Sequence, residues 1–280
     1  MLETKMARPN ESLRPYVWAY GMTTGRVDSA PLVIPLPARP KQLLTFSFAD
    51  RYCTSRGSAP TVATPRVAVV GPQSCAHPGL VISGCIDHFT VHFQPSGFNR
   101  LFRVPMTHLT DSVHEAHGVT GSMISALEQR LGEIADFAAR IQLVEAWFSR
   151  LLGNFAHRDP VAIAANRLFA THGTQRVSAM AQASGLSTRQ FERRFLIQVG
   201  LPPKFYSRII RFNAVLNDKL RDPNRTWSHI SHEYAYYDQM HFVRDCRDFT
   251  GQAPTGFLAR LDAAPEFHTF YASGDSPSRD

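Results

Sequence analysis

The sequence predicts an α+β protein of two domains, an N-terminal β-barrel with trailing helices and an all-α C-terminal domain. Three observations predict this division. Short alternating or apolar segments separated by turn residues fill the chain up to residue 95, which indicates strands. Helical periodicity begins near residue 122, and from residue 177 onward a helix-turn-helix pattern occurs twice. With 280 residues the chain is long enough for each domain to bury its own core.

The expected strands lie between residues 16 and 93. A first strand is indicated by three aromatic residues at alternate positions, Tyr16, Trp18 and Tyr20. Further short strands are expected at 42–48, 67–70, 80–83 and 86–93. Residues 31–39 are interrupted by prolines and 55–65 are rich in Gly, Ser, Pro and Thr, so both are expected to be loops. Many short strands with turn signals favour a barrel or a sandwich.

Helices are expected at 122–131, 137–155, 162–172 and 204–220. In the second of these, apolar residues share a face that could pack on the barrel or pair two subunits. The helix 204–220 would span roughly 25 Å. Residues 158–160 predict a boundary, which gives domains at 1–156 and 157–262. The polar residues 263–280 predict a disordered tail.

The stretch 177–206 has the features of a helix, a tight turn and a second helix. Gly185 can supply the positive φ that such a turn requires. Ser187 and Gln190 form the pattern of a capping box, so a new helix starts there. Phe191 and Phe195 would face the core, and Gly200 would end the helix. This is a helix-turn-helix, whose second helix enters a DNA major groove in proteins that use it.

The same pattern recurs about fifty residues later. At an offset of 51, the core, the cap and the stop of the first motif all have counterparts. The matched pairs are Phe191 with Phe242, Phe195 with Cys246, Ser187 with Asp238, Arg193 with Arg244, Gly200 with Gly251 and Pro203 with Pro254. Upstream of the turn the offset is 50, which one inserted residue explains. The sequence therefore predicts two helix-turn-helix motifs joined by the long helix.

On these residues the chain resembles the AraC/XylS family of bacterial transcriptional regulators. The segments that carry the resemblance are S-G-L-S-x-R-x-F-x-R-x-F…G-x-x-P and Y-Y-D-Q-M-H-F-V-R-D…F-T-G-Q-A-P, and it covers roughly residues 160 to 260. The resemblance implies a sequence-specific regulator that binds double-stranded DNA. It also implies contact with RNA polymerase, because the family most often activates promoters, although repression stays open.

The N-terminal half resembles, less closely, the cupin-like sensor domain of some regulators of this family. The segment G-P-Q…F-Q-P-S-G-F-N-R-L-F carries this resemblance. It implies either binding of a small-molecule effector or pairing into a homodimer.

The candidate DNA contacts are the polar positions of the two second helices. For base contacts they are Arg189, Gln190, Glu192, Arg193, Gln239, Met240, His241, Val243 and Arg244. For phosphate contacts and helix capping they are Ser187, Thr188, Lys204 and Asp238. Arginine recognises guanine, glutamine recognises adenine, and an apolar side chain contacts a thymine methyl. The alternative for Arg193 and Glu192 is an ordinary solvated helix face.

The second motif departs from the family pattern at three positions. Ala235 stands where the turn usually has glycine, Ser231 where a small alanine is usual, and Cys246 where an aromatic residue is usual. A left-handed conformation at Ala235 would cost about 1 kcal/mol. These departures leave two hypotheses open for the second motif, that it clamps the DNA backbone or that it reads bases.

The charge of the chain is concentrated on the repeated motifs. The formal net charge is +7, and residues 157–260 hold 15 Lys/Arg against 8 Asp/Glu. A basic surface there suits attraction to phosphates. Four cysteines without CxxC spacing predict free thiols in a reducing compartment. Because no apolar stretch resembles a signal or a membrane span, a cytoplasmic, nucleoid-associated protein without a membrane partner is expected.

The sequence contains no enzyme motif, so neither catalysis nor a cofactor is expected. His88 and His92 alternate on one strand opposite Phe89, Val91 and Phe93, and we expect them to face solvent or an interface. A cupin-type metal site at these histidines, with metal-binding or enzymatic activity fused to a DNA-binding module, is the alternative. An adaptor whose helices bind protein is a third hypothesis.

Overall fold

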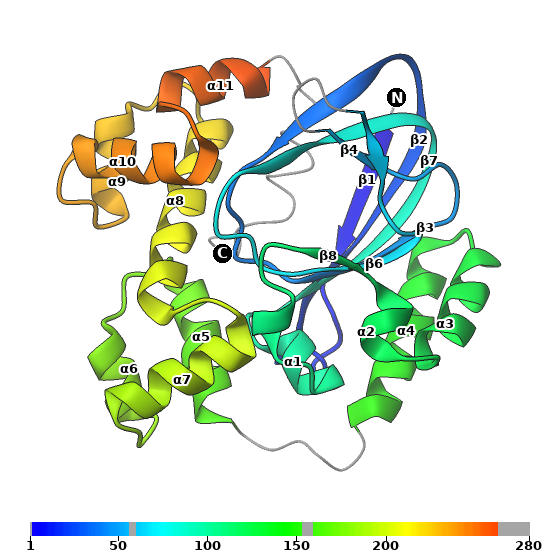
Figure 1. Cartoon of the computed structure of the whole chain (residues 1–280), viewed down its shortest axis with the longest axis horizontal. Helices are drawn as coiled ribbons and strands as arrows, with labels where there is room; N and C mark the ends of the chain where they lie inside the picture. The colour runs from blue at the N-terminus through cyan, green and yellow to red at the C-terminus, as the bar shows by residue number, and fades with distance from the viewer. Residues whose placement is uncertain (1, 56–59, 153–158, 263–280) are drawn as a thin grey trace.

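The computed structural model describes residues 2–55, 60–152 and 159–262, and it confirms the α+β fold (Figure 1). An antiparallel sheet with helices beside it forms the N-terminal part, and helices form the C-terminal part. The predicted tail 263–280 and residues 153–155 of the predicted helix 137–155 lie outside the described residues. The strands are β1 Leu2–Ala7, β2 Val17–Leu36, β3 Leu43–Ser47, β4 Cys53–Ser55, β5 Val62–Ala63, β6 Val67–Val70, β7 His77–Phe93 and β8 Val113–Glu115.

The strands form one antiparallel sheet in the order β1-β2-β7-β3-β6-β8, with β4 joined to β7 and β5 to β4. The two long strands pair with each other, for example Tyr20 with Val91 and Met22 with Phe89. A cavity is lined both by Met6 of β1 and by Val113 of β8, the two ends of this path. The sheet therefore curls around its concave face.

Two strands are longer than expected, and the reason lies in their irregularities. β2 continues through residues 31–36, which the prolines suggested were a loop, and β7 joins the predicted strands 80–83 and 86–93. The pairing of β2 with β7 shifts register between Val27 and Leu32 and again between Ile34 and Leu36. Pro31 and Pro35 fall in these two shifts. Proline is tolerated at such places because the ladder there needs no N–H.

Helices cover the convex face of the sheet. They are α1 Gly97–Phe102, η1 Met106–His108, α2 Ala116–Thr120, α3 Met123–Gly132 and α4 Phe137–Leu152. Val144 and Phe148 of α4 share a buried cluster with Phe89 and Phe93 of β7. The predicted apolar helix face therefore packs on the sheet.

A buried ion pair fixes α4 to this face. The guanidinium of Arg140 is 1% exposed and donates two hydrogen bonds to the Asp87 carboxylate, one of them 2.8 Å long. It also lies 4.4 Å from the centre of the Phe48 ring. The planar guanidinium can pair with the carboxylate and stack on the ring only in one orientation. The contact therefore sets the rotation of α4 on the sheet.

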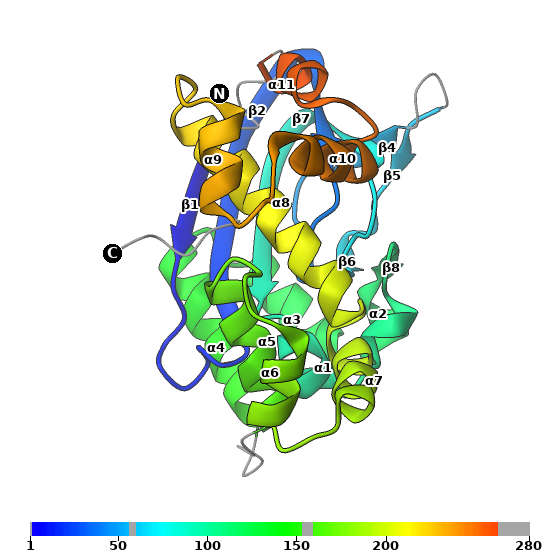
Figure 2. The same ribbon diagram turned by 90° about the vertical axis from the view of Figure 1, so that its left-hand side faces the viewer.

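The C-terminal helices are α5 Pro160–Ala170, α6 Val177–Ala183, α7 Thr188–Val199, α8 Pro203–Arg221, α9 Trp227–Glu233, α10 Gln239–Thr250 and α11 Pro254–Asp262. Asp159 caps α5, at the predicted boundary. Figure 2 shows α8 running between α6 and α7 at one end and α9 and α10 at the other. At 19 residues, α8 is about 28 Å long.

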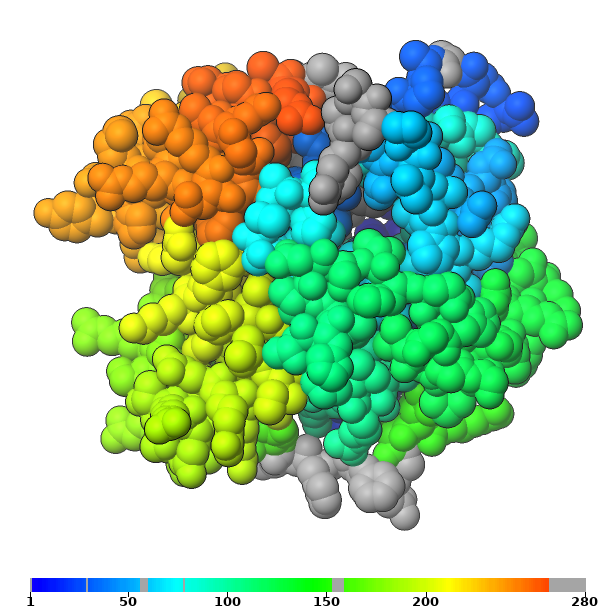
Figure 3. All heavy atoms as spheres, in the orientation of Figure 1, coloured from blue at the N-terminus to red at the C-terminus, as the bar shows by residue number. Residues whose placement is uncertain are grey.

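The sheet and the helical part are in side-chain contact (Figure 3). One buried apolar cluster continues from Ile34, Leu36 and Ile82 of the sheet to Phe212 and Phe249 of the helices. The Thr110 hydroxyl donates a hydrogen bond of 2.8 Å to the carbonyl of Gly200, the residue that ends α7. The domains predicted as 1–156 and 157–262 therefore share an apolar core. Within the described residues, no helix has the length and apolar character needed to cross a membrane.

Candidate nucleic-acid interface

The first motif has the turn and cap that the sequence indicated. Gly185 lies between α6 and α7 with φ 66°. The Ser187 hydroxyl accepts from the Gln190 N–H, and the Gln190 side chain accepts from the Ser187 N–H, so the capping box is complete. Phe191 and Phe195 are fully buried. With this inner face fixed, the opposite face of α7 is directed outward.

The predicted contact residues of α7 lie on that outward face. Arg189, Gln190 and Arg193 are exposed, whereas Glu192 is half-buried. The Gln190 carbonyl oxygen is held by the Ser187 N–H and hydroxyl, which ties this side chain to the cap. Ser187, Thr188 and Lys204 are also exposed. The structure therefore brings the predicted residues of the first motif together at the start of α7 and α8.

The second motif is built in the same way with one strained residue. Thr226 caps α9, and the Asp238 carboxylate accepts from the His241 N–H at 2.7 Å to cap α10. Ala235 lies in the turn with φ 58°. This is the left-handed conformation that was expected to cost about 1 kcal/mol if Ala235 adopted it. Phe242 and Cys246 are buried in the inner face. Burial raises the pKa of the Cys246 thiol to about 11, so it remains a neutral packing group.

The outward residues of α10 are less uniformly accessible than those of α7. Gln239, Met240 and Arg244 are exposed, and His241 and Val243 are half-buried. The His241 ring lies edge-on to Tyr236, with ring centres 5.1 Å apart. Gln239, Met240 and Arg244 therefore provide the most open surface of this helix.

A polar network holds α10 at a fixed angle to α8. Arg208 of α8 donates to Asp245 at 2.7 Å and to Asp248 at 2.6 Å. Asp245 is 1% exposed and also accepts from the Tyr236 hydroxyl at 3.0 Å. Burial and the neighbouring Asp245 carboxylate raise the pKa of Tyr236 far above its ordinary value, so the phenol stays a donor. This network positions the second helix-turn-helix.

Two features of this surface were not predicted from the sequence. Tyr237, directly before the Asp238 cap, is 91% exposed. The available signal was the Tyr236-Tyr237 pair directly ahead of the capping residue Asp238. A groove between the two motifs is lined by the basic residues Arg176, Lys204, Arg208 and Arg211, of which only Lys204 was predicted. These arginines were overlooked because they lie outside the second helices of the motifs.

The concave face of the sheet encloses a cavity of about 130 Å³. Carbon atoms make up most of the surface of its wall, which also carries Thr and Tyr52 hydroxyls, and Arg39 and Lys41 line it as well. Lys41 is 7% exposed, and its ammonium lies 3.8 Å from the centre of the Trp18 ring. No Asp or Glu is among the described residues that line the cavity. Its electrostatic character is therefore basic.

The expectation that His88 and His92 face solvent or an interface is wrong. Both side chains line the cavity. Helices cover the opposite face of β7 at Phe89 and Phe93, so neither face of this part of the strand is open to water, and alternation alone could not reveal that. Burial lowers the pKa of His88 to about 4, although the nearby Asp87 opposes the shift. Burial, with Lys41 and Arg39 nearby, also lowers the pKa of His92 well below its ordinary value.

The segment after β2 connects the cavity to the helical part. Leu36, Arg39 and Lys41 line the cavity. Between them, the Ala38 N–H donates to the Phe249 carbonyl of α10 at 2.9 Å, and the Ala38 carbonyl accepts from the Asn213 amide of α8 at 3.1 Å. We call residues 36–42 the connecting segment. The connecting segment therefore contacts both the cavity and the helical part.

Comparison with known proteins gives two family matches. Residues 180–260 match the family described as a helix-turn-helix domain, and residues 5–115 match a domain of unknown function (DUF6597). No curated protein matches the chain. The described helices α7 and α10 both lie inside the first match, which therefore covers both second helices.

Among solved structures, the chain is similar to ToxT from Vibrio cholerae. One ToxT structure, from strain O395, has a TM-score of 0.43 and 9% identity, over 93% of this chain and 98% of ToxT. A second, at 1.65 Å resolution, has a TM-score of 0.45 and 9% identity, over 86% of this chain and 98% of ToxT. A third is bound to (E)-4-(8-methylnaphthalen-1-yl)but-3-enoic acid. It has a TM-score of 0.43 and 10% identity, over 93% of this chain and 99% of ToxT.

Proposed function

We propose that this chain is an AraC-type regulator of transcription and that its two motifs, within the residues 180–260 that match a helix-turn-helix family, grip successive major grooves of one DNA duplex. The observation that carries this proposal is the pair of capped helices, α7 and α10, each with a buried apolar face and an exposed basic one. In this account α8, about 28 Å long, holds the helices roughly one helical turn of DNA apart.

Within this proposal the two motifs have different roles. Arg189 and Arg193 read bases from α7, while Thr188 and Lys204 contact phosphates. Glu192 is half-buried, so it makes at most an edge contact. In the second motif, Gln239, Met240 and Arg244 face the groove, and His241 and Val243 contribute only at its edge. Tyr237 is added as a contact, because a large exposed aromatic side chain next to α10 can pack on the sugar-phosphate backbone.

A binding experiment with matched charge changes tests the first motif. A preferred duplex is first selected from a random library with the full-length protein, and affinity is then measured over a range of salt. We expect affinity to fall steeply with salt, and Arg193→Ala to weaken binding to the preferred duplex by roughly 5- to 150-fold, the equivalent of about 1–3 kcal/mol.

The control is Arg150→Ala, which removes the same charge from an exposed position of α4 in the sheet half. It should leave the preferred sequence unchanged and affinity nearly so. Equal losses for Arg193→Ala and Arg150→Ala would contradict base reading by α7. Binding that does not depend on salt would contradict DNA recognition and favour the adaptor hypothesis.

The cavity of the sheet is the effector site in this proposal. Its basic side chains and the lack of carboxylates among its described lining residues favour a small anionic ligand with an apolar body. Arg39 and Lys41 would hold the anionic group. Since both belong to the connecting segment, occupancy would change the contacts of Ala38 with Phe249 and Asn213. Effector binding would thereby alter the relative position of α8 and α10.

Contact with RNA polymerase, activation and pairing of subunits belong to the same proposal. The apolar face of α3 and α4 is occupied by the sheet, so a homodimer would have to use another surface. Sedimentation of the full chain with and without its selected duplex would show the number of copies bound.

The alternative, a cupin-type metal or enzymatic site at His88 and His92, gains less support. Within the described residues, no third His, Cys, Asp or Glu joins these two in a cluster suited to a metal. A stoichiometric metal ion lost on His88→Gln and His92→Gln, but kept by variants elsewhere, would favour this alternative.

A further inference from the structure

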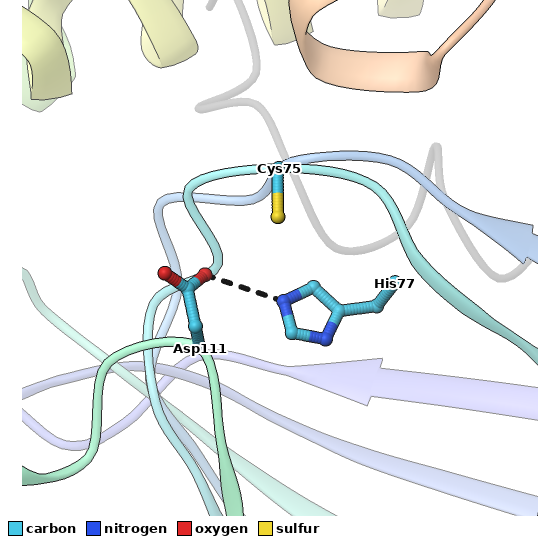
Figure 4. A group of neighbouring side chains, drawn as sticks. All are labelled: Cys75, His77 and Asp111. Atoms are coloured by element: carbon cyan, nitrogen blue, oxygen red, sulfur yellow. Dashed lines mark hydrogen bonds and ion pairs between the residues drawn. The ribbon is translucent and has the colours of Figure 1, made fainter.

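A group of three potential metal ligands lies outside the cavity and outside the DNA-binding surface. Cys75 lies in the loop between β6 and β7, and His77 is the first residue of β7. Asp111 lies in the loop between η1 and β8. Their ligand atoms all lie within 4.8 Å of one another. Figure 4 shows the Cys75 sulfur directed toward the space between the His77 ring and the Asp111 carboxylate. We propose that Cys75, His77 and Asp111 bind a divalent transition-metal ion of the Zn²⁺ class.

The spacing of the nitrogen and oxygen ligands already fits tetrahedral zinc. His77 Nε2 lies 3.2 Å from Asp111 Oδ1. Two ligands of a tetrahedral Zn²⁺, with bonds of about 2.0–2.2 Å, stand roughly 3.4 Å apart. The separation of these two atoms therefore needs to change little for an ion to bridge them, while the His77 ring turns to point Nε2 at the ion. Cys75 is exposed, so its side chain can rotate to bring the sulfur to bonding distance.

The surrounding chain holds the ligands in place without an ion. The Asp111 N–H donates to the Pro72 carbonyl at 2.9 Å, and the Gly71 N–H donates to the Ser112 carbonyl at 3.2 Å, so the two loops are joined. The Ser74 N–H and hydroxyl each donate to the Asp111 carboxylate at 2.6 Å. Hydrogen bonds of this kind orient a carboxylate ligand and are part of most metal centres.

The donor set identifies the class of ion. A thiolate, an imidazole and a carboxylate suit Zn²⁺ and its neighbours in the transition series, whereas Mg²⁺ and Ca²⁺ prefer oxygen ligands alone. Three protein ligands at an exposed position leave a fourth place for water or another ligand. The ion would also brace the loop whose Thr110 hydroxyl bonds Gly200 at the end of α7.

The test uses the full chain after treatment with a chelator. Zn²⁺ binding is measured by calorimetry, and Co²⁺ binding by absorption, because a cobalt–thiolate bond gives a charge-transfer band. We expect one Zn²⁺ per chain, not displaced by excess Mg²⁺, and a cobalt band that Cys75→Ser abolishes. Cys75→Ser, His77→Ala and Asp111→Asn should each weaken Zn²⁺ binding at least roughly tenfold. Asparagine is chosen because Asp111 has φ 59°, which asparagine tolerates.

The matched controls are Cys85→Ser and His108→Ala, which change exposed residues of the same types outside the group. Both should bind Zn²⁺ as the unchanged chain does. The proposal fails if the unchanged chain binds Zn²⁺ no better than the Cys75→Ser/His77→Ala double variant. It also fails if Cys85→Ser loses as much affinity as Cys75→Ser. Neither result bears on DNA binding, which is measured separately.

Discussion

His88 shows how one buried side chain makes stability depend on pH. Burial lowers its pKa to about 4 in the folded protein, against 6.5 as its ordinary value. The unfolded chain therefore takes up a proton first as pH falls. The stabilisation is complete above about pH 6.5 and is lost as pH falls toward 4. At 1.36 kcal/mol for each unit, the loss is about 3 kcal/mol, and His92 adds to it in the same direction.

Urea unfolding at several values of pH between 7.5 and 4.5 checks this prediction. The free energy of unfolding should fall with pH in the unchanged chain and fall less steeply in His88→Gln, because glutamine at position 88 does not titrate while His92 still does. An identical slope in the two proteins would show that His88 is not buried as a neutral ring.

At the scale of the element, the two turns offer a matched pair of substitutions. Ala235 and Gly185 occupy the same place in the two motifs, with φ 58° and 66°. A Cβ at Gly185 would meet nothing within 4 Å, so Gly185→Ala costs only backbone strain. We expect Ala235→Gly to raise the free energy of unfolding, and Gly185→Ala to lower it, each by about 1 kcal/mol.

Thermal or urea unfolding of both variants provides the measurement. A stabilised Ala235→Gly protein that also binds DNA more selectively would support the view that strain loosens the second motif. Destabilisation by Ala235→Gly would show that the left-handed turn is not strained in solution.

The two motifs were predictable from sequence because their signals are local. Helices begin at the capping residues Ser187, with Gln190, and Asp238, and they end at Gly200 and Gly251. Each of these signals acts through contacts within a few residues. The orientation of His88 and the path of β2 through Pro31 and Pro35 depend on strands far away in the chain. Likewise, the burial of Asp245 depends on Arg208 of another helix. Such features follow from tertiary packing, so neither periodicity nor turn residues could reveal them.

For the whole molecule, the contact between the sheet and α7 is the feature to test. Gly200 and Gly251 end equivalent helices, with φ 92° and 75°. A Cβ at Gly200 would lie 2.6 Å from Thr110 Oγ1 and 2.9 Å from Pro72 Cγ, whereas one at Gly251 would meet nothing within 4 Å. Both alanine variants carry backbone strain from a positive φ, but only Gly200→Ala also pushes the helical part away from the sheet.

We therefore expect Gly200→Ala to lose about 1–3 kcal/mol more stability than Gly251→Ala, the usual cost of overpacking. Hydrogen exchange should also show faster exchange around Thr110 in Gly200→Ala alone. Equal stability of the two variants would mean that the halves do not meet at Gly200 in solution.

The central claim is that α7 and α10 occupy two successive major grooves of one duplex. A hydroxyl-radical footprint of the full chain on its selected duplex tests it most directly. The account predicts two protected segments about one helical turn apart, with Arg193→Ala weakening one and Arg244→Ala the other. A single protected segment, unchanged in extent by Arg244→Ala, would contradict it.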